Sequence, residues 1–291
     1  MGLTRILFLV CFAAEGGVSQ SLQKVIEFSV RRYPRVDITS DDVRTILSRA
    51  ADTLNATCNR LNRSRSTKNN KPDQQTELVF SLRDDLSSIA TLSDSVLDRA
   101  DYPDSAKQAV RESERTGMYG RDAVEGLMIT PNPAGVLQIN IVEKIVSPCP
   151  SEFTPIPTPQ RETAPEGEYP WLGCSGYSGN VTVLRLFAPR VKSGSRRRYQ
   201  RWASREGILW AHEISHLLGL EDLEPALRPR LPRLQEGFGW LMMHPFDPMS
   251  VWLFPEECEV VMNYPANENQ RDVLRKYIEK VSTPDAPKLN K

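Results

Sequence analysis

Apolar residues recur at helical spacing in three parts of this sequence, and each part predicts helical structure. The first part follows Ser40, whose side chain is typical of a helix N-cap, and the spacing continues to Leu54. The second part predicts one helix before Tyr102-Pro103-Asp104 and another over Ser105–Arg115. The third part, Asn267–Val281, predicts a closing amphipathic helix.

Three segments have the short apolar runs that are typical of β-strands. They are Thr76–Leu82, Gly135–Val146 and Gly173–Leu186. Gly135–Val146 is the clearest, because Val-Leu-Gln-Ile-Asn-Ile-Val at its centre alternates apolar and polar residues. The sequence therefore predicts a sheet that is backed by the helix after Ser40.

Polar and proline-rich segments between these elements predict loops. Residues 59–75 are rich in Arg, Asn, Ser and Lys, and residues 147–171 are rich in proline and predict a long loop at the rim of a cleft. Lys192–Arg201 contains four arginines and predicts an exposed basic loop, with a protease-processing site as the alternative. Residues 284–291 predict a loose tail.

Composition narrows the class of protein. The chain has 37 basic and 37 acidic side chains among 291 residues, so its net charge gives no reason to expect nucleic acid or an anionic membrane as a partner. Residues 1–19 combine Arg5, a short apolar run and small residues, which is typical of a secretory signal peptide. No later segment is apolar enough to span a membrane. We therefore expect a secreted protein.

The cysteines fit that compartment. Cys11 lies in the expected signal peptide, and the remaining four form an even set that allows three disulfide connectivities. We favour Cys149 with Cys174 and Cys58 with Cys258. The sequons at Asn55, Asn62 and Asn180 are typical of a secreted glycoprotein.

The stretch Gly207–Asp222 has the residues of a catalytic metal site. His212 and His216 lie one helical turn apart on the same face, so two imidazoles can bind one metal ion. Glu213 lies beside the first histidine, where a carboxylate can act as a general base on water. Gly219 can end the helix and turn the chain, which would bring Asp222 back toward the metal as a third ligand.

The pattern His-Glu-x-x-His-x-x-Gly-x-x-Asp resembles the extended motif of the metzincin metalloendopeptidases, with the aspartate of their snapalysin-like branch. Phe246-Asp247-Pro248-Met249-Ser250 is similar to the methionine turn of that family, and it would place Met249 beneath the metal ligands. The resemblance implies a zincin-like α+β fold, in which a twisted mixed sheet carries an active-site helix and a C-terminal helix. It also implies a bound Zn²⁺ ion. An edge strand before the active-site helix, here Val181–Leu186, would pair with a polypeptide substrate.

Two other residues remain possible third ligands. Glu236, twenty positions after His216, stands where a thermolysin-like gluzincin places its glutamate, although the surrounding residues differ from that pattern. His244 is the second alternative, and a position in the substrate wall fits it better. Asp222 is the preferred third ligand.

These observations predict a secreted zinc-dependent endopeptidase, expected to be monomeric. The expected layout is a signal peptide over 1–19, one metalloprotease domain over 20–283 that includes any propeptide within 20–133, and the tail over 284–291. The rival hypothesis is a catalytically inactive secreted protein that keeps the zincin scaffold for binding.

Overall fold

The structure is a computed structural model of the 291-residue chain. It describes residues 22–69, 76–86, 104–129, 136–147, 149, 172–175, 181–191, 195–223, 239–242 and 249–282. Several sequence predictions lie outside these residues: the signal peptide, the helix expected before Tyr102, almost all of the proline-rich loop, Glu236, His244, and the C-terminal tail. Within the described part, no helix is long and apolar enough to cross a membrane.

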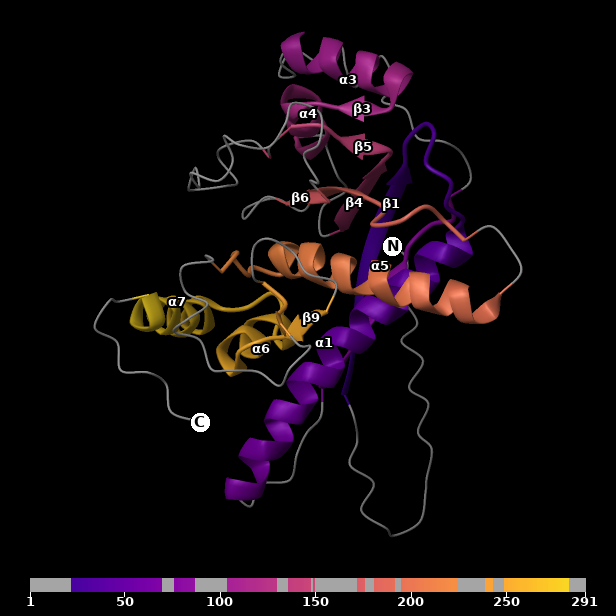
Figure 1. Cartoon of the computed structure of the whole chain (residues 1–291). Helices are drawn as coiled ribbons and strands as arrows, with labels where there is room; N and C mark the ends of the chain where they lie inside the picture. Colours follow the sequence, from indigo (N-terminus) through magenta and orange to yellow (C-terminus); the bar gives the residue numbers. More distant parts are fainter. Residues whose placement is uncertain are drawn as a thin grey trace, which may run out of the picture.

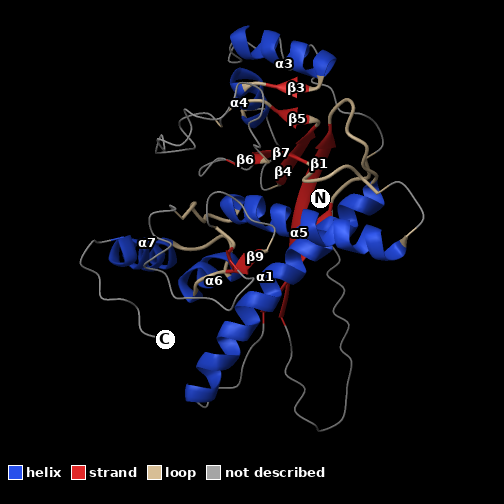
Figure 2. Cartoon of the chain, in the orientation of Figure 1, coloured by secondary structure: helices blue, strands red, loops and turns tan. Residues whose placement is uncertain are grey.

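A five-stranded mixed sheet forms the centre of the molecule, with the strand order β2-β1-β4-β7-β6 (Figure 2). Four strands are parallel, and β6 pairs antiparallel with β7 at one edge. The strands are β1 (Leu22–Arg32), β2 (Thr76–Leu82), β4 (Leu137–Val142), β6 (Gly173–Ser175) and β7 (Val181–Arg185). The expected mixed sheet with helices is therefore confirmed, together with the strand over Thr76–Leu82.

Both faces of the central strands are covered. All six residues of β4 are buried, and the polar residues in its alternating pattern do not face solvent. Instead, Gln138 Nε2 donates to Asn140 Oδ1 at 2.8 Å, and Asn140 Nδ2 donates to the carbonyl of Leu127 at 3.4 Å. These two hydrogen bonds satisfy both amide nitrogens and Oδ1 of Asn140 where water is excluded, whereas Oε1 of Gln138 is buried without a hydrogen-bond partner in the described part of the chain.

The main hydrophobic core lies between the sheet and two long helices, α1 (Ser40–Asn69) and α5 (Arg196–Leu217), which pack against each other (Figure 1). The contact is close because a Cβ atom on Gly207 would overlap Arg49. Glycine at this position therefore lets the two helix backbones approach. The close packing fixes α5, the helix that carries both candidate ligands.

A second core covers the other face of the sheet. It contains α3 (Asp104–Thr116), α4 (Arg121–Met128) and the small ladder of β3 (Met118–Tyr119) and β5 (Lys144–Ile145). Tyr33 and Tyr119 meet edge to face there, with ring centroids 6.0 Å apart. The predicted helix over Ser105–Arg115 corresponds to α3.

The C-terminal part packs against α1, and its helix α6 also contacts β2 (Figure 1). It contains β8 (Gly239–Trp240), β9 (Ser250–Trp252), α6 (Pro255–Met262) and α7 (Glu268–Ser282), the last of which confirms the predicted closing helix. The disulfide Cys58–Cys258 joins α1 to α6, and Cys149–Cys174 joins the residues after β5 to β6. Both favoured pairings are therefore confirmed.

Other predictions were wrong. Residues 59–69, expected in a loop, continue α1 as a polar helical extension. The arginines from Arg196 belong to α5 rather than to a loop, and Ser195 caps that helix by accepting from the N–H of Arg198 at 3.4 Å. Gly173–Leu186 forms two strands instead of one.

The sequon at Asn55 has a structural role. Its Nδ2 atom donates to the carbonyl of Leu78 at 2.8 Å, and its Oδ1 atom accepts from the N–H of Leu78 at 2.9 Å. Both bonds attach α1 to β2, so the nitrogen that would carry a glycan is already held against the sheet. The side chains of Asn62 and Asn180 lie outside the described part.

We predict that Glu257 makes stability depend on pH. Burial raises the pKa of Glu257 from its ordinary value of 4.5 to about 8, although its Oε2 accepts from the N–H of Phe254 at 2.6 Å. Because the folded state then holds a proton that the unfolded state has released, stability falls as pH rises from about 5 to about 8. A shift of this size corresponds to a few kcal/mol.

Urea unfolding of chelator-treated protein at pH 5 and pH 8 tests this prediction. Glu257→Gln should match the wild type at pH 5 and exceed its stability at pH 8. Glu259→Gln, an exposed position on the same helix, is the control and should follow the wild type at both values. Equal losses for wild type and Glu257→Gln between the two pH values would contradict the assignment.

Candidate metal centre

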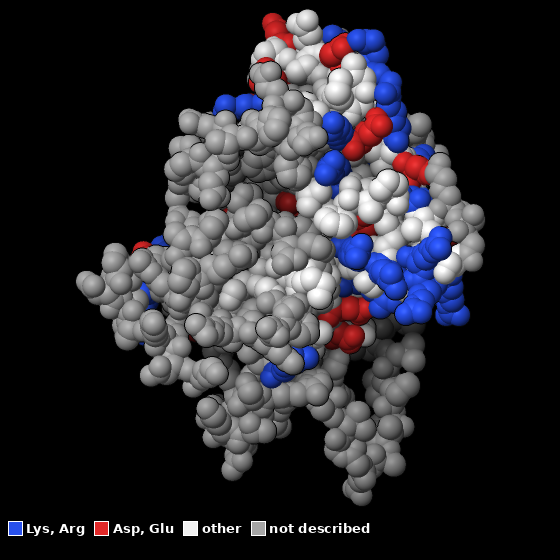
Figure 3. All heavy atoms as spheres, in the orientation of Figure 1, with Lys and Arg blue, Asp and Glu red and all other residues white. Residues whose placement is uncertain are grey.

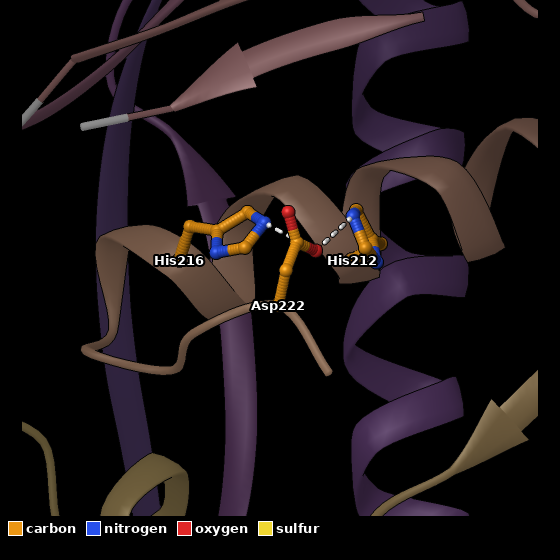
Figure 4. A group of neighbouring side chains, drawn as sticks. All are labelled: His212, His216 and Asp222. Atoms are coloured by element: carbon orange, nitrogen blue, oxygen red, sulfur yellow. Dashed lines mark ion pairs between the residues drawn. The ribbon is translucent and has the colours of Figure 1, made fainter. Parts of the chain in front are cut away.

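The C-terminal end of α5 brings three candidate ligands together. His212 and His216 lie in its last two turns, and the helix ends at Leu217. Gly219 has a φ of 103°, the left-handed conformation that favours glycine, and its N–H donates to the carbonyl of His216 at 3.0 Å. The chain turns sharply there and returns Asp222 to the two histidines (Figure 4).

The three side chains converge on one point. Oδ1 of Asp222 lies 3.5 Å from Nε2 of His212 and 3.4 Å from Nε2 of His216. The two imidazole rings are nearly perpendicular, at 86°, with centroids 4.9 Å apart. Both histidines are buried, whereas the Asp222 side chain is 28% exposed, so the group is reached from the side of the aspartate.

Backbone carbonyls fix the tautomer of both rings. Nδ1 of His212 lies 2.7 Å from the carbonyl oxygen of Leu241, and Nδ1 of His216 lies 2.9 Å from that of Leu220. A carbonyl oxygen can only accept, so each Nδ1 carries the hydrogen and donates it. In the neutral rings, each Nε2 then presents a lone pair toward Asp222.

Two nitrogen lone pairs and a carboxylate oxygen that face the same point repel one another unless a cation lies between them. Two imidazoles with one carboxylate are also a common ligand set of catalytic zinc. Backbone acceptors that orient metal-binding histidines through their other nitrogen are usual in such sites. The donor set of His212, His216 and Asp222 therefore fits a divalent transition metal such as zinc.

In the absence of a metal, a proton on Nε2 of His216 can relieve this repulsion. Burial alone would lower the pKa of His216, but the Asp222 carboxylate, with smaller contributions from Glu213 and the Leu220 carbonyl, raises it to about 9. The cluster thus attracts positive charge. A metal ion that binds here would have to displace the proton of His216.

Glu213 is held beside the ligands by the edge of the sheet. It is buried, and its Oε2 accepts a hydrogen bond from Oγ of Ser175 at 2.6 Å. Ser175 Oγ also lies 2.5 Å from Oγ1 of Thr182, which connects β6 to β7. A Cβ atom on Gly173 would overlap Oε1 of Glu213, so only glycine leaves room for this carboxylate.

The sequence pattern did not reveal Ser175, Gly173 or the two carbonyl acceptors. The prediction that Val181–Leu186 is the edge strand was also wrong. Residues Val181–Arg185 form β7, which lies between β4 and β6, and the edge belongs to β6. The edge strand is thus the one that contacts Glu213.

Met249 does not have the environment that was expected. Its side chain is 54% exposed, whereas a residue that packs beneath the ligands would be buried. Met242 is fully buried, and its carbonyl accepts from the N–H of Leu223, next to Asp222, at 2.6 Å. Residues 243–248, including His244, lie outside the described part, as does Glu236.

Comparison with known proteins gives little further information. No family profile matches the chain, and no curated protein matches it. Among solved structures, archaemetzincin from Methanopyrus kandleri is similar, with 11% sequence identity over 91% of this chain and 99% of the archaemetzincin chain. The TM-score is 0.31, which is too low to transfer fold details or function from one protein to the other.

We predict that Asp222 is required for tight metal binding. Asp222→Asn keeps the shape of the side chain but removes its charge, so zinc affinity should fall by about a hundredfold or more, since even indirect partners of ligands contribute 10–100-fold. Glu221→Gln removes the same charge from the adjacent exposed residue and should bind zinc like the wild type.

Competition with a chelating zinc indicator measures both affinities. Unchanged affinity in Asp222→Asn would exclude this residue as a ligand. Glu236→Gln would then be tested in the same assay.

Proposed function

We propose that this protein is a zinc-dependent endopeptidase. The observation that supports it most directly is the convergence of His212, His216 and Asp222 beside a buried glutamate. Metal ligands alone would also suit a structural site. Glu213 adds a carboxylate that is held next to the ligands by Ser175 but is not one of the three converging groups.

The residues of the site have separable roles. Nε2 of His212, Nε2 of His216 and Oδ1 of Asp222 would hold the metal. A bound zinc ion supplies Lewis acidity, which polarises a carbonyl group and lowers the pKa of water. Glu213 would accept a proton from the attacking water and pass it to the leaving amine. Ser175 and Gly173 would keep the carboxylate in one orientation.

A polypeptide substrate fits the position of β6. This strand is at the edge of the sheet, and its residues Gly173 and Ser175 contact Glu213. Backbone groups on the open side of an edge strand can pair with an extended peptide. A peptide that paired there would lie alongside the residue proposed as general base.

Secretion is part of the proposal. It is supported by the signal-like residues 1–19 and by two disulfides, which persist in oxidising compartments. A propeptide that is removed by proteolysis could not include β1 or α1. The strand β1 lies between β2 and β4, and α1 is joined to α6 through Cys58, so loss of either would open the core.

We predict that Glu213→Gln separates metal binding from hydrolysis. The variant should keep zinc, because Glu213 is not a ligand, but should hydrolyse an unfolded protein substrate about 10²–10⁴-fold more slowly, the usual contribution of a general base. His216→Ala should lose both zinc and activity. Zinc content by elemental analysis and cleavage by gel or mass spectrometry measure the two properties.

Glu221→Gln is again the control and should be fully active. If Glu213→Gln and His216→Ala both cleave as fast as the wild type, the site is wrong. Stoichiometric zinc in a wild-type protein without chelator-sensitive proteolysis would instead favour the inactive binding scaffold.

We also predict that Gly173→Ala impairs hydrolysis without loss of zinc. The added methyl group would displace the Glu213 carboxylate, because the three atoms nearest the new Cβ belong to the Glu213 side chain, and Glu213 is not one of the proposed ligands. The rate constant for cleavage should fall by about tenfold or more, in line with the strict geometry that proton transfer requires. Gly120→Ala is the matched control, because a Cβ atom there would meet nothing within 4 Å. Full activity of Gly173→Ala would show that the carboxylate can work from another position.

A further inference from the structure

A hollow of about 340 Å³ opens between α1, α5 and β9, and it shares no residue with the metal centre. The residues around it are Arg49, Asp52, Thr53, Ala56, Thr57, Arg60, Ser204, Ile208, Val251 and Trp252. Its volume is at the lower end of the range for ligand pockets, which is about 300–1,000 Å³. A hollow of this size suits one inserted side chain better than a large cofactor.

Two kinds of surface meet in the hollow. Ile208, Val251 and Trp252 give it an apolar wall, and α1 contributes two guanidinium groups. The guanidinium carbon of Arg60 lies 4.8 Å from the centroid of the Trp252 ring. Arg49 is held in place by a hydrogen bond from its Nη2 to Oε1 of Gln200 at 2.7 Å and by an ion pair between its Nη1 and Oδ2 of Asp52 at 3.5 Å.

The basic character continues beyond the hollow along α5. Five arginines in the first half of this helix are exposed, and Figure 3 shows Lys and Arg side chains gathered over this part of the surface. They are Arg196, Arg197, Arg198, Arg201 and Arg205. Residues 197, 201 and 205 are spaced four apart and therefore lie on one face, next to the hollow residues Ser204 and Ile208. Among the described residues, no acidic side chain forms an ion pair with these five arginines.

Helix stability does not explain this arrangement. The amino end of a helix carries a partial positive charge, which disfavours nearby cations. The first turn of α5 has no acidic residue and contains Arg196, Arg197 and Arg198. Like charges four residues apart repel as well. A helix end that is locally unfavourable but exposed is typical of a functional surface.

We propose that the hollow and the α5 arginines together bind an acidic polypeptide segment that inserts one apolar side chain. The apolar wall of Ile208, Val251 and Trp252 would receive that side chain, and the flanking carboxylates would pair with Arg60, Arg201 and Arg205. Nucleic acids and sulfated polysaccharides match the charge, but they offer no aliphatic or phenyl group for the apolar wall. The surface is thus a second peptide site, separate from the metal centre.

Fluorescence anisotropy with the full chain tests the proposal. The probe is a labelled peptide with the sequence Glu-Glu-Phe-Glu-Glu, and the comparison peptide is Glu-Glu-Ser-Glu-Glu. The phenylalanine peptide should bind about tenfold or more tightly than the serine peptide, because its apolar ring would be removed from water. Affinity for both should fall as salt increases. Mass spectrometry of the recovered peptide confirms that it is intact, so the result does not depend on proteolytic activity.

Two variants locate the binding site. Arg201→Glu/Arg205→Glu should weaken binding of the phenylalanine peptide by about tenfold or more. Arg111→Glu/Arg121→Glu changes net charge equally at exposed positions on α3 and α4 and should bind like the wild type. Ala56→Phe should fill the hollow, and it should weaken binding of the phenylalanine peptide more than that of the serine peptide. Thermal unfolding confirms that each variant is folded.

Equal affinity for the two peptides, or equal losses in the two arginine variants, would overturn the proposal. Tighter binding of heparin or of phosphatidylserine vesicles than of the phenylalanine peptide would also overturn it, because a polyanion without an apolar side chain would then be the better match. If Glu213→Gln hydrolysed protein as fast as the wild type, the proposed role of Glu213 would be wrong. The peptide-binding result would be unaffected.

Discussion

Two hydrogen bonds from histidine to backbone carbonyls determine which nitrogens face the candidate metal centre. The carbonyls of Leu220 and Leu241 accept from Nδ1 of His216 and His212. Without these acceptors, a neutral ring could carry its hydrogen on Nε2 and would then offer no lone pair toward Asp222. With them, the hydrogen of each neutral ring stays on Nδ1, and both Nε2 lone pairs face the same point as the carboxylate.

The two acceptors come from different parts of the fold. Leu220 follows the turn at Gly219, so its position depends only on the end of α5. Leu241 lies in the segment after β8, and its own N–H donates to the carbonyl of Trp252 in β9 at 2.6 Å. This C-terminal segment is attached to α1 through Cys58–Cys258, and α1 packs against α5. The orientation of His212 therefore depends on a closed chain of contacts through the main core.

The local part of the site could be predicted from the sequence, and the long-range part could not. His212, Glu213, His216, Gly219 and Asp222 are close in sequence, so helical periodicity and the conformational freedom of glycine suffice to place them together. The carbonyl of Leu241 has no sequence signature, because every residue carries one. Gly173 and Ser175 contact Glu213 from 38 or more positions away, and only the pairing of β6 with β7 brings them there.

Two errors in the predicted elements come from the way in which charged segments were interpreted. Residues 59–75 and Lys192–Arg201 were interpreted as loops because polar and charged residues are frequent there. Arginine is, however, a good helix former, so Arg196–Arg201 extends α5 once Ser195 caps it. One 22-residue helix thus carries an exposed arginine surface at one end and two buried candidate metal ligands at the other. The same β9 strand that lines the hollow accepts the hydrogen bond that fixes Leu241, and Leu241 in turn orients His212. The hollow and the candidate metal centre therefore share one backbone segment, β9, as a wall of the first and a support of the second.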